Sequence, residues 1–226
     1  MIIVLRGHIR NSFNNLDLYN FINYLSNNYT IEIYIHTWSI KQNNISWRLI
    51  NNDFTEITKN YIQDYFQDLY KYIKKIIIDN DNNIKLIGNL DGKILSTKTS
   101  IIGWKRYIYS QYRILEYIYN FFDDKHIFVV NTRFDLFTNS FVFPFHEIIN
   151  FIKNNYNKIF TKNIFLRNDE YCGIDNIILG NIQTNYHLMQ NIHLNLDKIL
   201  LCKNNQGLQY PEFIVSRTNN EQITNK

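Results

Sequence analysis

The 226-residue chain contains no alanine, only two prolines, seven glycines and two cysteines. The low content of proline and glycine argues against a Pro/Gly-rich linker, and the length suits one domain. Two cysteines cannot form the disulfide framework of a small secreted protein, and the spacing of Cys172 and Cys202 fits no zinc motif. We therefore expect free thiols in a reducing compartment, which predicts a cytoplasmic protein. The missing alanine, together with abundant asparagine and isoleucine, is typical of an AT-rich coding sequence.

Several functional signatures are also missing. The sequence has no P-loop, no G-x-G-x-x-G, no H-E-x-x-H and no G-x-S-x-G. No apolar run approaches the roughly 18 residues of a membrane helix, and the apolar run at residues 2–5 is too short for a signal peptide. These absences disfavour P-loop enzymes and α/β-hydrolases, and they predict a soluble protein without a transmembrane segment.

Charge is mildly positive, with a formal net charge of +4. The basic residues are scattered, whereas a nucleic-acid interface needs a concentrated stripe. We therefore expect no nucleic-acid partner, although phosphate-bearing ligands are compatible with this charge.

Hydrophobic patterning predicts alternating strands and helices. Residues 2–5 read as a buried strand, 16–25 as a helix and 31–36 as a second strand, which gives a parallel pair with a right-handed crossover. Further strands are predicted at 76–78, 84–87, 126–130 and 177–179, and helices at 55–73, 104–122, 146–156 and 183–196, with a less regular region at 37–53. This pattern predicts one α/β domain over residues 1–217, with a mostly parallel central sheet flanked by helices, and a polar tail over 218–226.

Basic side chains follow the first predicted strand. Arg6, His8 and Arg10 place two fixed cations and one titratable group around Gly7, which permits close backbone approach. Ligands of open α/β sheets bind beyond the carboxyl ends of the strands. The cluster therefore suits a diphosphate, and the alternative is a solvated basic loop.

Two aromatic residues end the second strand. His36 and Trp38 lie two residues apart, so an extended backbone places them on one face. The indole of Trp38 would stack on a nucleotide base or a sugar ring. The alternative is a core Trp38 beside a hydrogen-bonded core His36.

Acidic residues complete the predicted site. Asp135 follows the strand at 126–130, where it would bind a divalent cation that bridges donor phosphates while Arg133 holds a phosphate; the alternative is an ion pair between the two. Asp175 would be a general base for an acceptor hydroxyl or an anchor for the acceptor. Asp169 and Glu170 are expected in a solvated turn.

The order of these blocks resembles a known family. Residues 6–10 (RGHIR), 34–38 (YIHTW), 128–136 (FVVNTRFDL, preceded by a helix with SQY at 110–112) and 175–180 (DNIILG) occur in this order. They resemble the small glycosyltransferase-like proteins of bacterial capsule and lipopolysaccharide gene clusters and of large DNA viruses. The resemblance covers residues 6–180 and implies a GT-A-like fold in the cytoplasm of a bacterium or a virus-infected host cell.

The resemblance also implies a reaction: transfer of a sugar from a nucleotide-sugar donor to a hydroxyl of a glycan acceptor. Such enzymes commonly use Mn or Mg held by an Asp-x-Asp pair, but here the position two residues before Asp135 is Arg133, which leaves the metal dependence open. Without a metal, Arg6, Arg10 or Arg133 would stabilise the leaving diphosphate. Two alternatives stay open: a nucleotidyltransferase or sugar-nucleotide-modifying enzyme, and a catalytically degenerate glycan-binding or scaffold protein of the same fold.

Overall fold

The computed structural model of the chain describes residues 1–43, 51–94, 97–138, 143–166, 174–202 and 211–221. Its central sheet has six strands in the order β5-β2-β1-β6-β8-β7, and a separate two-stranded sheet pairs β3 with β4. The strands are β1 (Ile2–Arg6), β2 (Glu32–Trp38), β3 (Ile40–Gln42), β4 (Asp53–Glu56), β5 (Ile73–Asp79), β6 (Phe128–Arg133), β7 (Ile164–Phe165) and β8 (Ile177–Asn181).

The described part of the chain also contains six α-helices. They are α1 (Asp17–Asn28), α2 (Lys59–Phe66), α3 (Ile101–Phe121), α4 (Phe145–Lys153), α5 (Ile182–Leu201) and α6 (Glu212–Glu221). Local sequence sets the start of the two longest helices. The Ser100 side chain accepts from the backbone N–H of Gly103 at the start of α3, and Asn181 with Thr184 forms a capping box at the start of α5.

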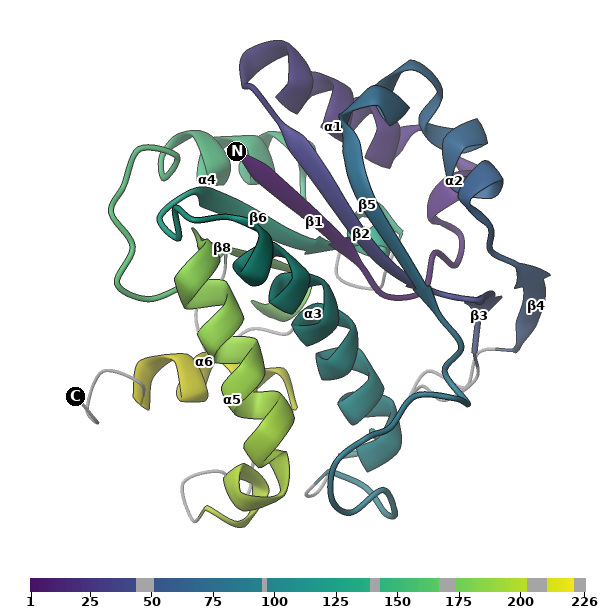
Figure 1. The fold of residues 1–226 in the computed structure, drawn as a ribbon, viewed down its shortest axis with the longest axis vertical. Helices are drawn as coiled ribbons and strands as arrows, with labels where there is room; N and C mark the ends of the chain where they lie inside the picture. Colours follow the sequence, from purple (N-terminus) through teal and green to yellow (C-terminus); the bar gives the residue numbers. More distant parts are fainter. Residues whose placement is uncertain (44–50, 95–96, 139–142, 167–173, 203–210, 222–226) are drawn as a thin grey trace.

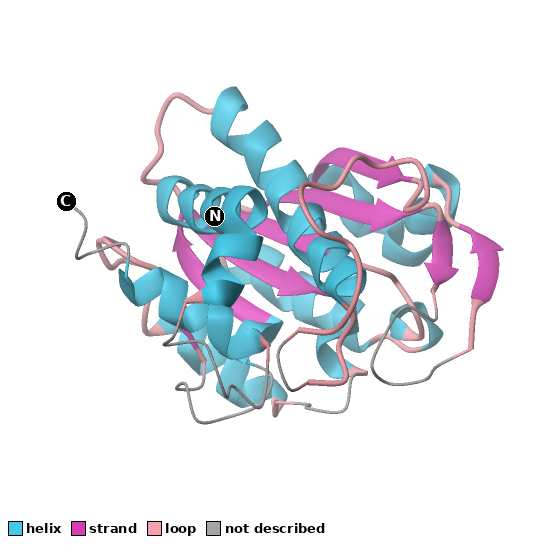
Figure 2. Ribbon diagram, turned by 90° about the horizontal axis from the view of Figure 1, so that it is seen from below, coloured by secondary structure: helices cyan, strands magenta, loops and turns pink. Residues whose placement is uncertain are grey.

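The sheet lies between two helical layers with separate hydrophobic cores (Figures 1 and 2). Alternate residues of the central strands point to opposite faces, so Ile3 and Leu5 of β1 pack against α1, α2 and α4, while Ile2 and Val4 pack against α3, α5 and α6. Because both faces are covered, all five residues of β1 are buried. The predicted α/β class, with a mostly parallel sheet flanked by helices, is confirmed.

The topology creates a crevice beside β1. Strands β1, β2, β5 and β6 are parallel, and β8 runs antiparallel to β6. The chain proceeds from β1 outward to β2 and β5, and then returns to place β6 on the other side of β1. In this register Arg6 pairs with both His36 and Arg133, so three predicted site residues are neighbours at the carboxyl edge of the sheet. Such a switch point is where open α/β sheets bind ligands.

Three details differ from the sequence-based expectations. Residues 84–87 form no strand, because the segment is a loop whose Ile87 carbonyl accepts from the ammonium of Lys105. The less regular region instead contains β3, and its partner β4 includes residues 55 and 56 of the expected helix at 55–73, so that α2 begins only at Lys59. Helix α6 continues to Glu221, so residues 218–221 of the expected tail are helical, and the 2% exposed Asn219 donates to the carbonyl of Asn163 at 2.9 Å.

Within the described ranges, no helix is both long and apolar enough to cross a bilayer.

Candidate functional site

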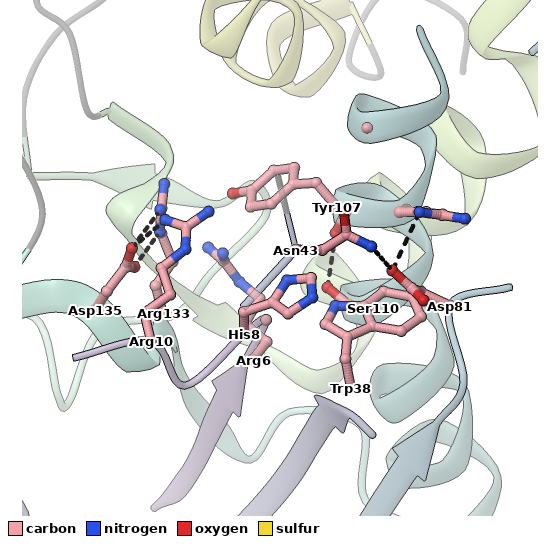
Figure 3. A pocket seen from close by; sticks show the side chains of 13 residues that line it. Arg6, His8, Arg10, Trp38, Asn43, Asp81, Tyr107, Ser110, Arg133 and Asp135 are labelled. Atoms are coloured by element: carbon pink, nitrogen blue, oxygen red, sulfur yellow. Dashed lines mark hydrogen bonds and ion pairs between the residues drawn. The ribbon is translucent and has the colours of Figure 1, made fainter. Parts of the chain in front are cut away.

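A pocket of about 560 Å³, including its open mouth, lies at the carboxyl edge of β1, β2 and β6. Its walls come from the loop after β1, from the segment after β6 and from the N-terminal half of α3 (Figure 3). Four arginines and two aspartates line it. Arg6, Gly7, His8, Arg10, Trp38, Arg133 and Asp135 are the predicted residues that it brings together.

Arg6, the last residue of β1, forms the floor of the pocket. Its side chain is 1% exposed; Nε donates to Asn131 Oδ1 at 2.8 Å and Nη2 donates to the carbonyl of Asp175 at 2.5 Å. The third nitrogen, Nη1, is buried without a partner. The turn that follows requires glycine, since Gly7 has φ of +93°.

Asp135 holds two arginines at one end of the pocket (Figure 3). Arg133 donates from Nε to Oδ1 at 2.7 Å and from Nη2 to Oδ2 at 2.8 Å, and Arg10 donates from Nη1 to Oδ2 at 2.6 Å. Burial opposes the charge of Arg133, but attraction to Asp135 outweighs it and raises the pKa of Arg133. The alternative reading of Arg133 and Asp135, an ion pair between the two, is therefore present in the structure, with Arg10 as a third member.

This donor set does not fit Mn or Mg. Both oxygens of Asp135 already accept from guanidinium groups, whereas a divalent cation needs several oxygen ligands. Arg6, Arg10 and Arg133 would also repel a cation here. Among the described residues, no cluster of three or more His, Cys, Asp or Glu side chains suits a metal ion.

Aromatic rings form a second wall. His8 stacks on Trp38 with ring centroids 5.8 Å apart, and Tyr109 stacks on Trp38 at 6.1 Å. Trp38 is 2% exposed, so it backs His8 and does not offer an open face to a base or sugar, which corrects the expected stacking role. Burial, followed by repulsion from Arg10 and Arg106, lowers the pKa of His8 to about 3. Its imidazole is therefore neutral at pH 7, and its buried Nε2 has no partner.

His36 lies behind this wall and not in the pocket. The side chain is fully buried, and Nε2 lies 3.1 Å from Asp79 Oδ2, which also accepts from the hydroxyl of Tyr109 at 3.1 Å. Burial lowers the pKa of His36, although Asp79 acts in the opposite direction. The alternative of a core Trp38 beside a hydrogen-bonded core His36 describes the structure.

Asp175 lies next to the pocket but does not line it. The residue is 2% exposed, and its backbone carbonyl accepts from Arg6 and from the hydroxyl of Tyr107, at 3.3 Å in the second case. Oδ1 is buried without a hydrogen-bond partner. Asp169, Glu170 and Cys172 lie outside the described residues, and Cys202 is an exposed free thiol.

Helix α3 and the loop after β5 supply residues that the sequence analysis missed. The ring of Tyr107 lies near two guanidinium groups: its centroid is 5.0 Å from Cζ of Arg6 and 6.0 Å from Cζ of Arg133. Gly103, Arg106, Tyr107 and Ser110 all line the pocket, and their i, i+3, i+4, i+7 spacing is the signal that places them on one helix face.

Asp81 forms the far end of the pocket from Asp135 (Figure 3). Its Oδ2 accepts from Arg106 Nη1 at 3.1 Å and from Asn43 Nδ2 at 2.5 Å. This carboxylate follows β5, and the strand expected at residues 76–78 is the signal that could have placed it at the carboxyl edge of the sheet.

Positive charge exceeds negative charge in this pocket. Four arginines face Asp81, Asp135 and the neighbouring buried Asp175, while His8 is neutral. The arrangement is suited to an oxyanion such as a phosphate or diphosphate, held by guanidinium donors next to a flat imidazole face. Comparison of the chain with protein-family models, curated proteins and solved structures finds no match.

Proposed function

We propose that the chain is a glycosyltransferase with a GT-A-like fold that transfers a sugar from a nucleotide-sugar to a hydroxyl of a glycan acceptor. The observation that carries this proposal is the convergence of Arg6, Arg10 and Arg133 in one pocket at the switch point of the sheet. Guanidinium groups from the ends of two adjacent strands suit the diphosphate of a nucleotide donor. The resemblance of the block order to that of the glycosyltransferase-like family supports the same activity.

The arginines stabilise the leaving group in this proposal. The acceptor oxygen forms a bond to the anomeric carbon while the bond from that carbon to the diphosphate oxygen breaks, and the electron pair leaves with the nucleoside diphosphate. Arg10 and Arg133 donate to the phosphate oxygens where this charge develops, and Arg6 adds the field of a buried cation. The neutral ring of His8, backed by Trp38, provides a flat surface for the base or sugar.

The acceptor proton goes to Asp175 in this proposal. The Asp175→Asn variant separates that role from an anchoring role, because the contact with Arg6 uses the backbone carbonyl and survives the substitution. We expect donor affinity to stay within about twofold and turnover to fall at least 100-fold, the scale of general-base catalysis. Equal loss of affinity and turnover would instead show that the carboxylate acts through its charge on Arg6.

The test of the activity is a donor screen followed by product analysis. Purified protein is heated with each of a panel of nucleotide-sugars and free nucleotides, with EDTA or with Mn²⁺, and a bound ligand raises the melting temperature. The donor that binds is then incubated with glycan acceptors, and release of a nucleoside diphosphate supports transfer. Release of pyrophosphate would identify a nucleotidyltransferase instead, and no shift for any nucleotide-sugar contradicts the proposal.

One observation favours a binding protein of the same fold as a second candidate. Asp175 is 2% exposed, which shields the predicted base from an acceptor. Nucleotide-sugar binding without turnover over the full acceptor panel would support this candidate.

A further inference from the structure

Asp135 accepts hydrogen bonds from the same guanidinium N–H groups that a bound phosphate would use. Its two oxygens accept three charge-assisted hydrogen bonds from Arg10 and Arg133 at 2.6–2.8 Å, and the residue is 3% exposed. A carboxylate and a phosphate present oxygen pairs of similar geometry to a guanidinium group. The side chain therefore stands where a ligand oxyanion would otherwise be bound.

Some N–H groups of the arginines around Asp135 have no hydrogen-bond partner. Arg6 Nη1 and Arg10 Nε are buried N–H groups without a partner, and Arg6 itself is 1% exposed. Leaving such donors unpaired in a protein interior is costly, and an oxyanion in the pocket would remove that cost. A divalent cation would do the opposite, since it brings no acceptor atoms and meets three arginines.

We propose that Asp135 is the internal counter-ion of an arginine clamp that binds the donor diphosphate without a divalent cation, and that the ligand competes with Asp135 for Arg10 and Arg133. The inference rests on the proposed function for the identity of the ligand, but the clamp itself requires only a diphosphate. It assigns Asp135 the role of a positioning residue that lowers anion affinity, in contrast to a metal ligand that would raise it.

Calorimetric titration with inorganic pyrophosphate in EDTA tests this assignment. We expect the wild-type protein to bind, and Asp135→Asn, which keeps the shape but removes the charge, to bind about tenfold tighter because two arginines lose their internal partner. The matched control is Asp197→Asn, whose partly exposed carboxylate pairs with Lys105 and does not line the pocket, and we expect its affinity to change by about twofold or less. Weaker binding by Asp135→Asn, or wild-type binding only with Mn²⁺, overturns the proposal.

Arg10→Gln keeps the test valid if Asp135→Asn does not fold. The Arg10 side chain is 19% exposed, so its loss is tolerated more easily than a change at Arg6, and we expect about tenfold weaker pyrophosphate binding in EDTA. Unchanged affinity overturns the clamp. A clamp that binds pyrophosphate but no nucleotide-sugar contradicts only the proposed function, whereas a nucleotide-sugar bound only with Mn²⁺, and lost in Asp135→Asn, contradicts only the clamp.

Discussion

Both ends of the pocket contain arginine and aspartate, but the ratio of positive to negative charge differs between them. At one end, Asp135 and the buried Asp175 face Arg6, Arg10 and Arg133, so the cations are in excess. At the other end, one carboxylate, Asp81, holds one arginine, Arg106, with help from the amide of Asn43.

This difference separates a binding device from a structural one. At the Asp81 end the charges of one carboxylate and one arginine balance, although Arg106 Nε is buried without a partner, and the pair joins α3 to the loop after β5. An excess of buried positive charge is unfavourable unless an anion arrives to complete it, and a protein keeps such an excess where a ligand supplies the missing charge. The Asp135 end is therefore the one we assign to phosphate.

The largest expected effect is on stability. Asp135→Asn leaves Arg10 and Arg133 buried with no carboxylate between them, so we expect the free energy of unfolding to fall by about 3 kcal/mol. Asp81→Asn leaves one buried arginine, and we expect a smaller loss of about 2 kcal/mol. Urea denaturation of both variants at one ionic strength measures the difference.

Pyrophosphate provides the control for this pair. The ligand should restore more stability to Asp135→Asn than to Asp81→Asn, because only the first variant has an uncompensated anion site. Equal losses in the two variants, with equal recovery, would mean that the two ends do not differ as their charge balance indicates.

The fold follows closely from hydrophobic patterning, and its departures have local causes. Continuous apolar runs such as residues 2–5 and 127–130, the second within the strand expected at 126–130, predict buried parallel strands because helices cover both faces of the sheet. The same reasoning failed at residues 84–87, since Ile84, Leu86 and Ile87 belong to a loop that is held by Lys105 and has no strand partner. A β-pairing partner is a property of the tertiary structure, so a short apolar run does not reveal its absence.

The sequence predicts the site residues that follow strand ends, but it does not predict those on helix α3. Arg6, Arg10, Arg133 and Asp135 follow strands whose carboxyl ends meet at one edge, which the alternation of strands and helices implies. Tyr107 flanks the apolar stripe of α3 and packs against the same core, so its spacing alone does not distinguish it from a core residue. The three-way contact of Asp135 depends on the conformation of Arg10, at φ of +53°, and no sequence pattern specifies it.

His8 lies between the two ends of the pocket, and one arginine from each end, Arg10 and Arg106, contributes to lowering the pKa of its ring. Its pKa of about 3 in the folded state is below the ordinary value of 6.5, so the unfolded chain binds a proton in this range and the folded protein does not. Stability from the neutral ring is complete above pH 6.5 and is lost as the pH falls toward 3. Between pH 6.5 and 4.5 we expect the wild-type protein to lose about 2 kcal/mol more than His8→Gln, measured by urea denaturation at each pH.

Arginine variants measure how much each end of the pocket contributes to lowering the pKa of His8. Repulsion from Arg10 lowers the pKa more than repulsion from Arg106, so the His8 pKa should rise further in Arg10→Gln than in Arg106→Gln, although burial keeps both below 6.5. Titration of the His8 ring by NMR, assigned with His8→Gln, measures each value. A larger rise in Arg106→Gln would place the stronger field at the balanced end and contradict the comparison.

Tyr107 serves the cation-rich end in particular, since its ring lies near Arg6 and Arg133. Tyr107→Leu removes the π face that attracts both guanidinium groups, and we expect about fivefold weaker pyrophosphate binding in EDTA, equivalent to about 1 kcal/mol. Tyr107→Phe is the matched control, because it keeps the ring and removes only the 3.3 Å hydrogen bond to the Asp175 carbonyl, and its affinity should stay within about twofold. If the two variants lose affinity equally, the hydroxyl and not the ring positions the clamp, which would make the carbonyl of Asp175 the common anchor of Arg6 and Tyr107.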